Sequence, residues 1–312
     1  MPPHTRAWLQ IHFCVVLWGF TAILGKLITL PALSLVWWRM TLVTIALLLI
    51  PKVWSGVSRL SWRLVAIYAG IGVVVAAHWL TFYGSIKVSN ASVAATCMAL
   101  TPVFLTFVEP LLVGRRFDSR ELLFALAIIP GVALVVGGTP GEMRLGIVIG
   151  ALSSLFVAVF SSLNKRYIEH GEALSVTGIE MAAGALFLTL ASPLIPGFGP
   201  LFILPDAHDI VLLMVLAMGC TLLPFALSLV ALRHLSAFTS VLAINMEPVY
   251  AIVLAIILLG EQRELEPGFY LGVAIIMIVV FSHPLLMRRQ AAVTANGVAG
   301  ADRPGRDTTG SV

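Results

Sequence analysis

The chain alternates between long apolar runs and short connectors rich in glycine, proline and charged residues. A membrane-spanning helix needs about 20 apolar residues to cross roughly 30 Å of hydrocarbon. The apolar positions show no period of two, so the runs do not resemble the strands of a membrane barrel. Lipid offers no hydrogen-bond partner to a bare backbone amide, so each run is predicted to be a helix. The ten predicted spans cover residues 9–29, 32–50, 62–82, 91–112, 120–137, 145–163, 174–194, 209–230, 236–259 and 267–286.

Composition indicates the same fold class, an all-α integral membrane protein. Of the 312 residues, 59% are hydrophobic and 11% are charged, whereas a soluble domain carries about 25% charged residues. The mean hydropathy is +1.02. The chain therefore lacks the polar surface of a water-soluble enzyme, a disordered protein or a nucleic-acid-binding protein. Cys14, Cys97 and Cys220 lie inside apolar runs and are predicted to be small buried hydrophobic residues.

The two ends of the chain need separate interpretation. The first apolar run follows a basic residue, Arg6, as the core of a signal peptide would, but it is too long for such a core. No polar domain follows it, so we predict a retained first helix. Residues 288–312 are rich in glycine, alanine, threonine and charge, and we predict that they form a disordered cytoplasmic tail.

Basic residues predict the orientation of the spans, because cytoplasmic loops carry an excess of lysine and arginine. With the N-terminus in the cytoplasm, twelve basic residues fall on the cytoplasmic side. Four fall on the opposite side, namely Lys26, Lys87, Arg144 and Arg263. Both termini of this multi-pass protein are therefore predicted to be cytoplasmic, and the plasma membrane is its expected location.

The two halves of the chain resemble each other in sequence. A shift of 146 residues aligns 83–115 with 229–261 without gaps. This alignment matches Lys87 with Arg233, Pro102 with Pro248 and Gly114 with Gly260. Each half holds five spans, an odd number, so the second half must enter the membrane inverted relative to the first. We predict two inverted five-helix repeats, residues 1–140 and 141–287, an arrangement typical of secondary transporters.

Short motifs occur in a fixed order along both halves. They are Trp18-Gly19, Lys26, Arg39, Ser89 to Ala95 and Thr101-Pro102, followed by Leu235-Ser236-Ala237, Glu247-Pro248-Val249 and Gly260-Glu261. Over residues 8–287 the chain resembles the ten-helix EamA family of the drug/metabolite transporter superfamily. The resemblance implies the movement of small metabolites, with export favoured over import. The chain departs from the family pattern at Glu109, Arg115 and Glu180, so the resemblance does not indicate the substrate.

Two charged residues near the centres of their spans are candidates for substrate binding. An ionisable side chain at the centre of a membrane costs about 2.5–3.5 kcal/mol on insertion scales, so it needs a partner or a water-filled cavity. Arg39 is either a cavity cation for a carboxylate or phosphate, or one partner of a salt bridge between helices. Glu247 directly precedes Pro248, which removes an amide donor and can free a carbonyl in the preceding turn.

Two further acids lie off the centres of their spans. Glu180 shares one helical stripe with Thr177 and Gly184. Such a stripe either lines a path, which we favour, or permits close helix approach. Glu109 lies near Arg115 at the cytoplasmic end of its span, which favours a structural role.

The remaining candidates are polar or aromatic. His78 is either a hydrogen-bonding residue between helices or a proton relay. Trp18 and Trp79 lie deeper than the other tryptophans, and each either walls a site or fills the core. Lys26 is a second candidate for binding a phosphate, and Thr101 belongs to one of the motifs that resemble the family.

These features predict a secondary transporter that moves small polar metabolites, such as amino acids, by alternating access. The alternative is a carrier of a phosphorylated, nucleotide-linked or lipid-linked substrate, because Arg39 and Lys26 suit a phosphate. An intramembrane enzyme is disfavoured, since the chain has no His-Glu-x-x-His motif, no Gly-x-Ser-x-Gly motif and no acid cluster with metal-ligand spacing.

The expected partners are a small-molecule substrate, the lipid bilayer and protons as coupling ion. The sequence is compatible with a monomer and does not determine the oligomeric state. We expect no cofactor and no metal. A carboxyl group couples transport to protons only if its charge changes during the cycle, and apolar surroundings disfavour the charged form. We favour Glu180 over Glu247 for this role, because the Glu-Pro pair is also suited to substrate binding.

Overall fold

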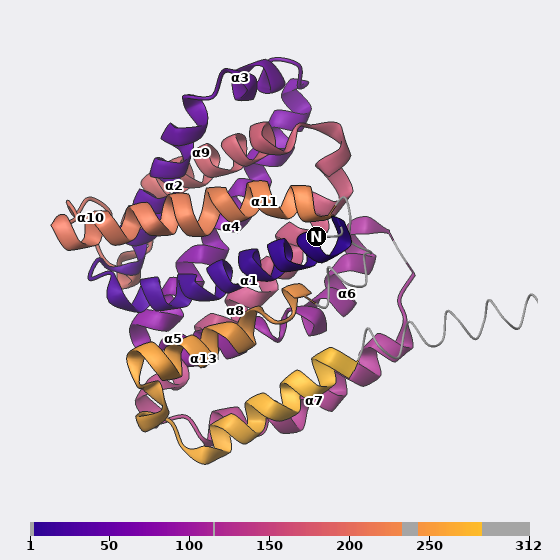
Figure 1. Ribbon diagram of the computed structural model, residues 1–312, viewed down its shortest axis with the longest axis vertical. Coiled ribbons are helices and arrows are strands. Elements are labelled where there is room, and N and C mark those ends of the chain that lie inside the picture. Colours follow the sequence, from indigo (N-terminus) through magenta and orange to yellow (C-terminus); the bar gives the residue numbers. More distant parts are fainter. Residues whose placement is uncertain (1–2, 115, 233–242, 283–312) are drawn as a thin grey trace, which may run out of the picture.

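A computed structural model describes residues 3–114, 116–232 and 243–282, all of them in helices and short connections (Figure 1). The first half contains α1 (Pro3–Leu27), α2 (Ala32–Leu48), α3 (Pro51–Val57), α4 (Trp62–Val88), α5 (Ala91–Met98), α6 (Thr101–Val113) and α7 (Ser119–Gly137). The second half contains α8 (Arg144–Tyr167), α9 (Ala173–Ala191), α10 (Ala207–Met214), a π-helix (Val215–Leu222), α11 (Leu223–Leu232), α13 (Glu247–Leu259) and the helix Pro267–Ser282. Arg115, the segment 233–242 with Arg233, and the predicted tail from Arg288 lie outside the described residues.

The helices match the expectation of a multi-pass membrane protein. Within the described residues, six helices are long and apolar enough to cross a membrane, and seven if the bent pair of α2 and α3 counts as one span. Three shorter apolar helices, Glu121–Gly137, Glu247–Leu259 and Pro267–Ser282, occupy the positions of the fifth, ninth and tenth predicted spans. The prediction of an all-helical membrane protein is therefore confirmed.

Two predicted spans of the first half differ from single straight helices. The second ends at Leu48, and the chain bends by 93° into α3. The fourth is broken after Met98, where the amides of Ala99 and Leu100 bond to carbonyls three residues back, at 3.1 and 3.0 Å. The cause of this break is Pro102, which has no amide hydrogen to donate and whose ring crowds the preceding turn.

The contacts between helices repeat in the two halves. Helix α1 packs against α13, as α8 packs against α6, and α1 packs against α11, as α8 packs against α4. In these contacts α1 corresponds to α8, α13 to α6 and α11 to α4. Replacing each helix by its counterpart in the other half therefore converts one contact into the other. Helices α2 and α9, which match each other, lie in direct contact. The two halves are therefore repeats of one five-span unit.

Local backbone geometry supports the same correspondence. Gly114 ends α6 at a φ of 78°, and Gly260 ends α13 at a φ of 70°. A left-handed residue at this position closes a helix at little cost only if it is glycine. The break before α6 also has a counterpart before α13, where the Met246 amide bonds to the Ala243 carbonyl at 3.0 Å. The sequence shift of 146 residues thus pairs positions that share one conformation.

Candidate functional site

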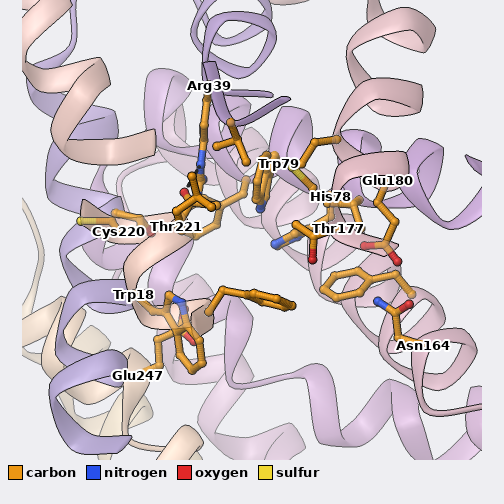
Figure 2. Close-up of a pocket in the computed structure, with 18 of the residues that line it drawn as sticks. Trp18, Arg39, His78, Trp79, Asn164, Thr177, Glu180, Cys220, Thr221 and Glu247 are labelled. Atoms are coloured by element: carbon orange, nitrogen blue, oxygen red, sulfur yellow. Dashed lines mark hydrogen bonds between the residues drawn. The ribbon is translucent and has the colours of Figure 1, made fainter. Parts of the chain in front are cut away.

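A cavity of about 290 Å³ lies in the middle of the bundle. Both repeats contribute to its walls, through α1, α2, α4 and α5 from the first and α8, α9, the π-helix, α11 and α13 from the second. Figure 2 shows its polar residues, with Arg39 and Glu180 reaching in from different helices. Trp18, Trp79, Phe82 and Phe160 supply aromatic walls. A mostly apolar pocket with a few convergent polar groups is typical of a small-molecule site.

Arg39 is the cation of this cavity and is held by neutral groups. Its Nε and Nη2 donate hydrogen bonds to the Thr221 hydroxyl at 3.0 and 2.9 Å, and its Nη1 donates to the Tyr83 hydroxyl at 2.8 Å. The guanidinium carbon lies 3.6 Å from the ring centroid of Trp79, in a cation–π contact. Among the residues that the structure describes, no carboxylate forms an ion pair with Arg39. Its positive charge is therefore oriented but not neutralised.

The π-helix positions the main partner of Arg39. Thr221 lies near the end of this helix, and its hydroxyl donates to the Leu216 carbonyl at 2.8 Å, five residues back. This bond leaves the lone pairs of the hydroxyl oxygen directed at the two N–H groups of Arg39. A π-helical turn is rare and frequently marks a functional site. No sequence pattern in this apolar segment indicated it.

Glu180 is an almost fully buried acid with an unused oxygen. The residue is 6% exposed, and its Oε1 has no hydrogen-bond partner. The Asn164 side chain lies beside the carboxyl group (Figure 2). Gly72 of α4 allows this placement, because a Cβ there would lie 2.2 Å from the Glu180 carbonyl oxygen. Helices α4 and α9 thus approach closely where Glu180 enters the cavity.

Glu247 is the first residue of α13 and lies beside Trp18 (Figure 2). The amino end of a helix carries a partial positive charge, which stabilises a carboxylate in the first turn. The two acids of the cavity therefore differ in their surroundings, since Glu247 lies in the first turn of its helix and Glu180 lies in the middle of α9 beside a neutral amide.

His78 connects two helices at the wall of the cavity. The hydroxyl of Ser153 lies 2.9 Å from the His78 carbonyl and 2.8 Å from Nδ1 of the same residue. A neutral imidazole has one donor nitrogen and one acceptor nitrogen. His78 joins α4 to α8 and also lines the cavity.

Seven of the nine candidate residues line this one cavity, which are Trp18, Arg39, His78, Trp79, Thr177, Glu180 and Glu247. Lys26 and Thr101 do not. Lys26 is exposed at the end of α1, where its Nζ donates to the Ser89 carbonyl at 3.3 Å. Thr101 begins α6. The sequence analysis missed Tyr83, Asn164 and Thr221, although their polar side chains inside apolar spans were a usable signal.

Other sequence candidates have structural partners. Glu109 forms an ion pair with Lys165 from α8, which agrees with its structural interpretation. It also lines a second cavity of about 180 Å³ between α6, α7 and the helix Pro267–Ser282. Cys14, Cys97 and Cys220 are all free and buried, as predicted, and Cys220 lines the central cavity.

An all-helical bundle of two repeats, with a polar cavity between them, defines a membrane transport protein. The model of the EamA-like transporter family matches residues 6–137 and 144–283. The chain belongs to the EamA-like transporter family and contains two EamA domains, which places it in the drug/metabolite transporter superfamily.

Comparison with known proteins otherwise supports the fold alone. A structure titled "Crystal structure of protein" superposes with a TM-score of 0.60 at 18% sequence identity, over 92% of this chain and 99% of that chain. No curated protein matches the sequence.

Proposed function

We propose that the protein is a secondary transporter of small metabolites that carry a carboxylate, with amino acids as the best fit. The observation that carries this proposal is the geometry of Arg39, whose charge is held by two hydroxyls and an aromatic ring but has no described anionic partner. A planar guanidinium can bind both oxygens of a carboxylate. The carboxylate of Glu180 suits the ammonium group of the same substrate.

Transport proceeds by alternating access between the two inverted repeats, with the cavity as the binding site. The family resemblance supports export from the cytoplasm across the plasma membrane. Both termini are cytoplasmic in this proposal, because the side of the membrane that holds the N-terminus carries most of the basic residues. The chain acts as a carrier and not as an enzyme. With domain limits near residues 140 and 287, the residues that line the cavity come from both repeats.

A phosphorylated, nucleotide-linked or lipid-linked substrate is less well supported. Such a substrate carries up to two negative charges on its phosphate and favours several cations. Among the described residues that line the cavity, Arg39 alone has a permanent positive charge. Lys26, the second cation that suggested a phosphate, lies at the end of α1 and not at the cavity.

We propose Glu180 as the proton-coupling residue of the cycle. Its Oε1 is buried without a partner, and its neighbour Asn164 is neutral. A carboxyl group so placed is better tolerated when protonated, whereas Glu247 lies in the first turn of α13, where the helix dipole favours the charged form. Proton binding at Glu180 can therefore alternate with binding of the substrate ammonium group.

The test is uptake by purified protein in liposomes loaded with one unlabelled candidate substrate. Radiolabelled amino acids, phosphate esters and amines are supplied outside in turn. We expect amino acids to exchange, Arg39→Ala to abolish the exchange, and Arg39→Lys to restore only part of it, because an ammonium group lacks the planar fork. Arg59→Ala, which removes an exposed arginine far from the cavity, is the matched control. Exchange of phosphate esters alone would support the alternative substrate class.

A further inference from the structure

Two carboxylates of the second repeat bind backbone amides of the first repeat at one end of the bundle. We call this end the distal face, defined by the end of α1 and the start of α10, on the left of Figure 1. Asp209 accepts from the Thr29 amide at 2.9 and 3.2 Å and from the Thr29 hydroxyl at 2.7 Å. Glu261 accepts from the amides of Ala91 and Ser92 at 2.9 and 2.8 Å.

Both carboxylates are placed for strong bonds. Asp209 is 1% exposed and Glu261 is 0% exposed, so water does not compete for their oxygens. Hydrogen bonds to an ionised acceptor are about twice as strong as neutral ones. Glu261 also faces the amino end of α5, where free amides and the helix dipole favour an anion. Each acid therefore fixes a connection of the first repeat, the α1–α2 turn or the α4–α5 turn.

Bonds within the first repeat complete the closure of this face. Lys87 at the end of α4 donates to the Ile28 carbonyl, and Lys26 at the end of α1 donates to the Ser89 carbonyl. The side chains of Ile28 and Leu30 are buried beneath these bonds. The α1–α2 and α4–α5 turns thus form one polar layer. The second repeat holds it through Asp209 and Glu261, and also through the more exposed Glu264, which accepts from the Asn90 side-chain amide at 3.0 Å.

The central cavity lies closer to the opposite, proximal face. Asn164 lies three residues before the end of α8, and Thr177 lies four residues after the start of α9. At 1.5 Å per residue, these positions are about 4.5 and 6 Å from the proximal helix ends. Thr21, Phe82 and Arg39 lie six or seven residues from the distal ends of α1, α4 and α2, which is about 9–10 Å.

We propose that Asp209 and Glu261 form a latch that keeps the distal face shut while the cavity faces the proximal side. The proposal rests on alternating access as the proposed function. When the cavity turns to the distal side, both carboxylates must release the amides of Thr29, Ala91 and Ser92. They are positioning residues, since neither lines the cavity nor touches a substrate held there.

A cavity cysteine tests the latch without any need to know the substrate. Met98, which lines the cavity, is replaced by cysteine in a chain whose native cysteines are replaced by alanine. A membrane-impermeant methanethiosulfonate is added to one side or the other of oriented proteoliposomes. In the otherwise unchanged chain we expect labelling mainly from the proximal side. In the double variant Asp209→Asn and Glu261→Gln, we expect distal labelling to rise by about tenfold and proximal labelling to fall.

Two charge-matched variants are the controls. Asp206→Asn and Glu266→Gln remove the same charge from exposed neighbouring side chains, and asparagine at 206 can still accept the bond from the Asp209 amide that Asp206 accepts at 2.7 Å. Both should label as the parent chain does. Equal distal labelling of the parent and of a monodisperse double variant would overturn the latch. Equal labelling of the parent from both sides would instead overturn alternating access, the basis of the proposed function.

A crosslink keeps the latch testable if the double variant does not fold. Thr29→Cys and Asp209→Cys, joined by a short bifunctional thiol reagent with a reducible spacer, replace the carboxylate bond by a covalent one. We expect substrate exchange to stop when the crosslink forms and to return when the spacer is reduced. Continued exchange by the crosslinked protein would refute the latch, with exchange before crosslinking as the internal control.

Discussion

The hydroxyl of Thr221 should determine how well Arg39 binds a substrate. This one oxygen accepts hydrogen bonds from both Nε and Nη2 of Arg39, at 3.0 and 2.9 Å. Valine has nearly the same shape as threonine but no hydroxyl, so Thr221→Val removes both bonds, together with the bond that this hydroxyl donates to the Leu216 carbonyl within the π-helix. The guanidinium then keeps only the Tyr83 hydroxyl and the Trp79 ring as partners.

The size of the effect follows from the bonds that are lost. A hydrogen bond to a charged group contributes about 1.5–3 kcal/mol. Arg39 loses two bonds, but water entering the cavity replaces part of this energy, so we take the value of one bond as the net loss. If this loss appears in substrate binding, Kd rises roughly 10- to 150-fold. The loss reaches binding because an unrestrained guanidinium must be ordered again by the substrate.

Calorimetric titration of an exchanged amino acid into detergent-purified protein measures this change. Thr221→Ser is the matched control, since serine keeps the hydroxyl, and its Kd should stay within about threefold of the parent value. The melting temperature of each variant checks that folding is unchanged. An unaltered Kd for Thr221→Val, beside lost binding in Arg39→Ala, would show that the π-helix does not orient the arginine for binding.

Three further predictions concern coupling, helix approach and topology. Glu180→Gln, which mimics the protonated acid, should retain exchange but lose accumulation driven by a pH gradient; concentration of substrate by this variant would exclude Glu180 as the coupling residue. Gly72→Ala should destabilise the protein by about 1–3 kcal/mol in thermal unfolding, because its Cβ would meet the Glu180 backbone, and an unchanged melting temperature would contradict this close approach. A single cysteine in 196–207 should be labelled from outside intact cells, and a single cysteine beyond Arg289 should not. The opposite pattern would reverse the topology.

The sequence was sufficient to predict the helices and the repeat, because membrane spans and backbone breaks have strong local causes. Apolar runs of span length specify helices in lipid. Pro102, Pro248, Gly114 and Gly260 recur at one spacing because they create the same break and the same helix end in each repeat. The bend between α2 and α3 has no equally strong signal.

The residues of the cavity were partly predictable for a different reason. A charged residue buried at membrane depth needs a partner or a water-filled cavity, so Arg39, Glu180 and Glu247 were candidates for a cavity from the sequence alone. Lys26 and Thr101 were chosen from family motifs, and motifs do not specify which way a side chain points. Thr221 depends on the π-helix, which rotates the helix surface relative to an α-helix. That rotation depends on contacts between distant segments.

Matched positions in the two repeats carry opposite chemistry, which explains how a symmetric scaffold gives a polarised cavity. Arg39 is the eighth residue of α2, and Glu180 is the eighth residue of α9. Thr101 and Glu247 each begin the helix that follows the break in their repeat, and Glu247 alone of this pair lines the cavity. When the two repeats exchange conformations, each charged residue therefore meets different surroundings from those of its counterpart. The two access states must differ in energy, and a bound zwitterion or a proton can shift the balance between them because it interacts differently with each state.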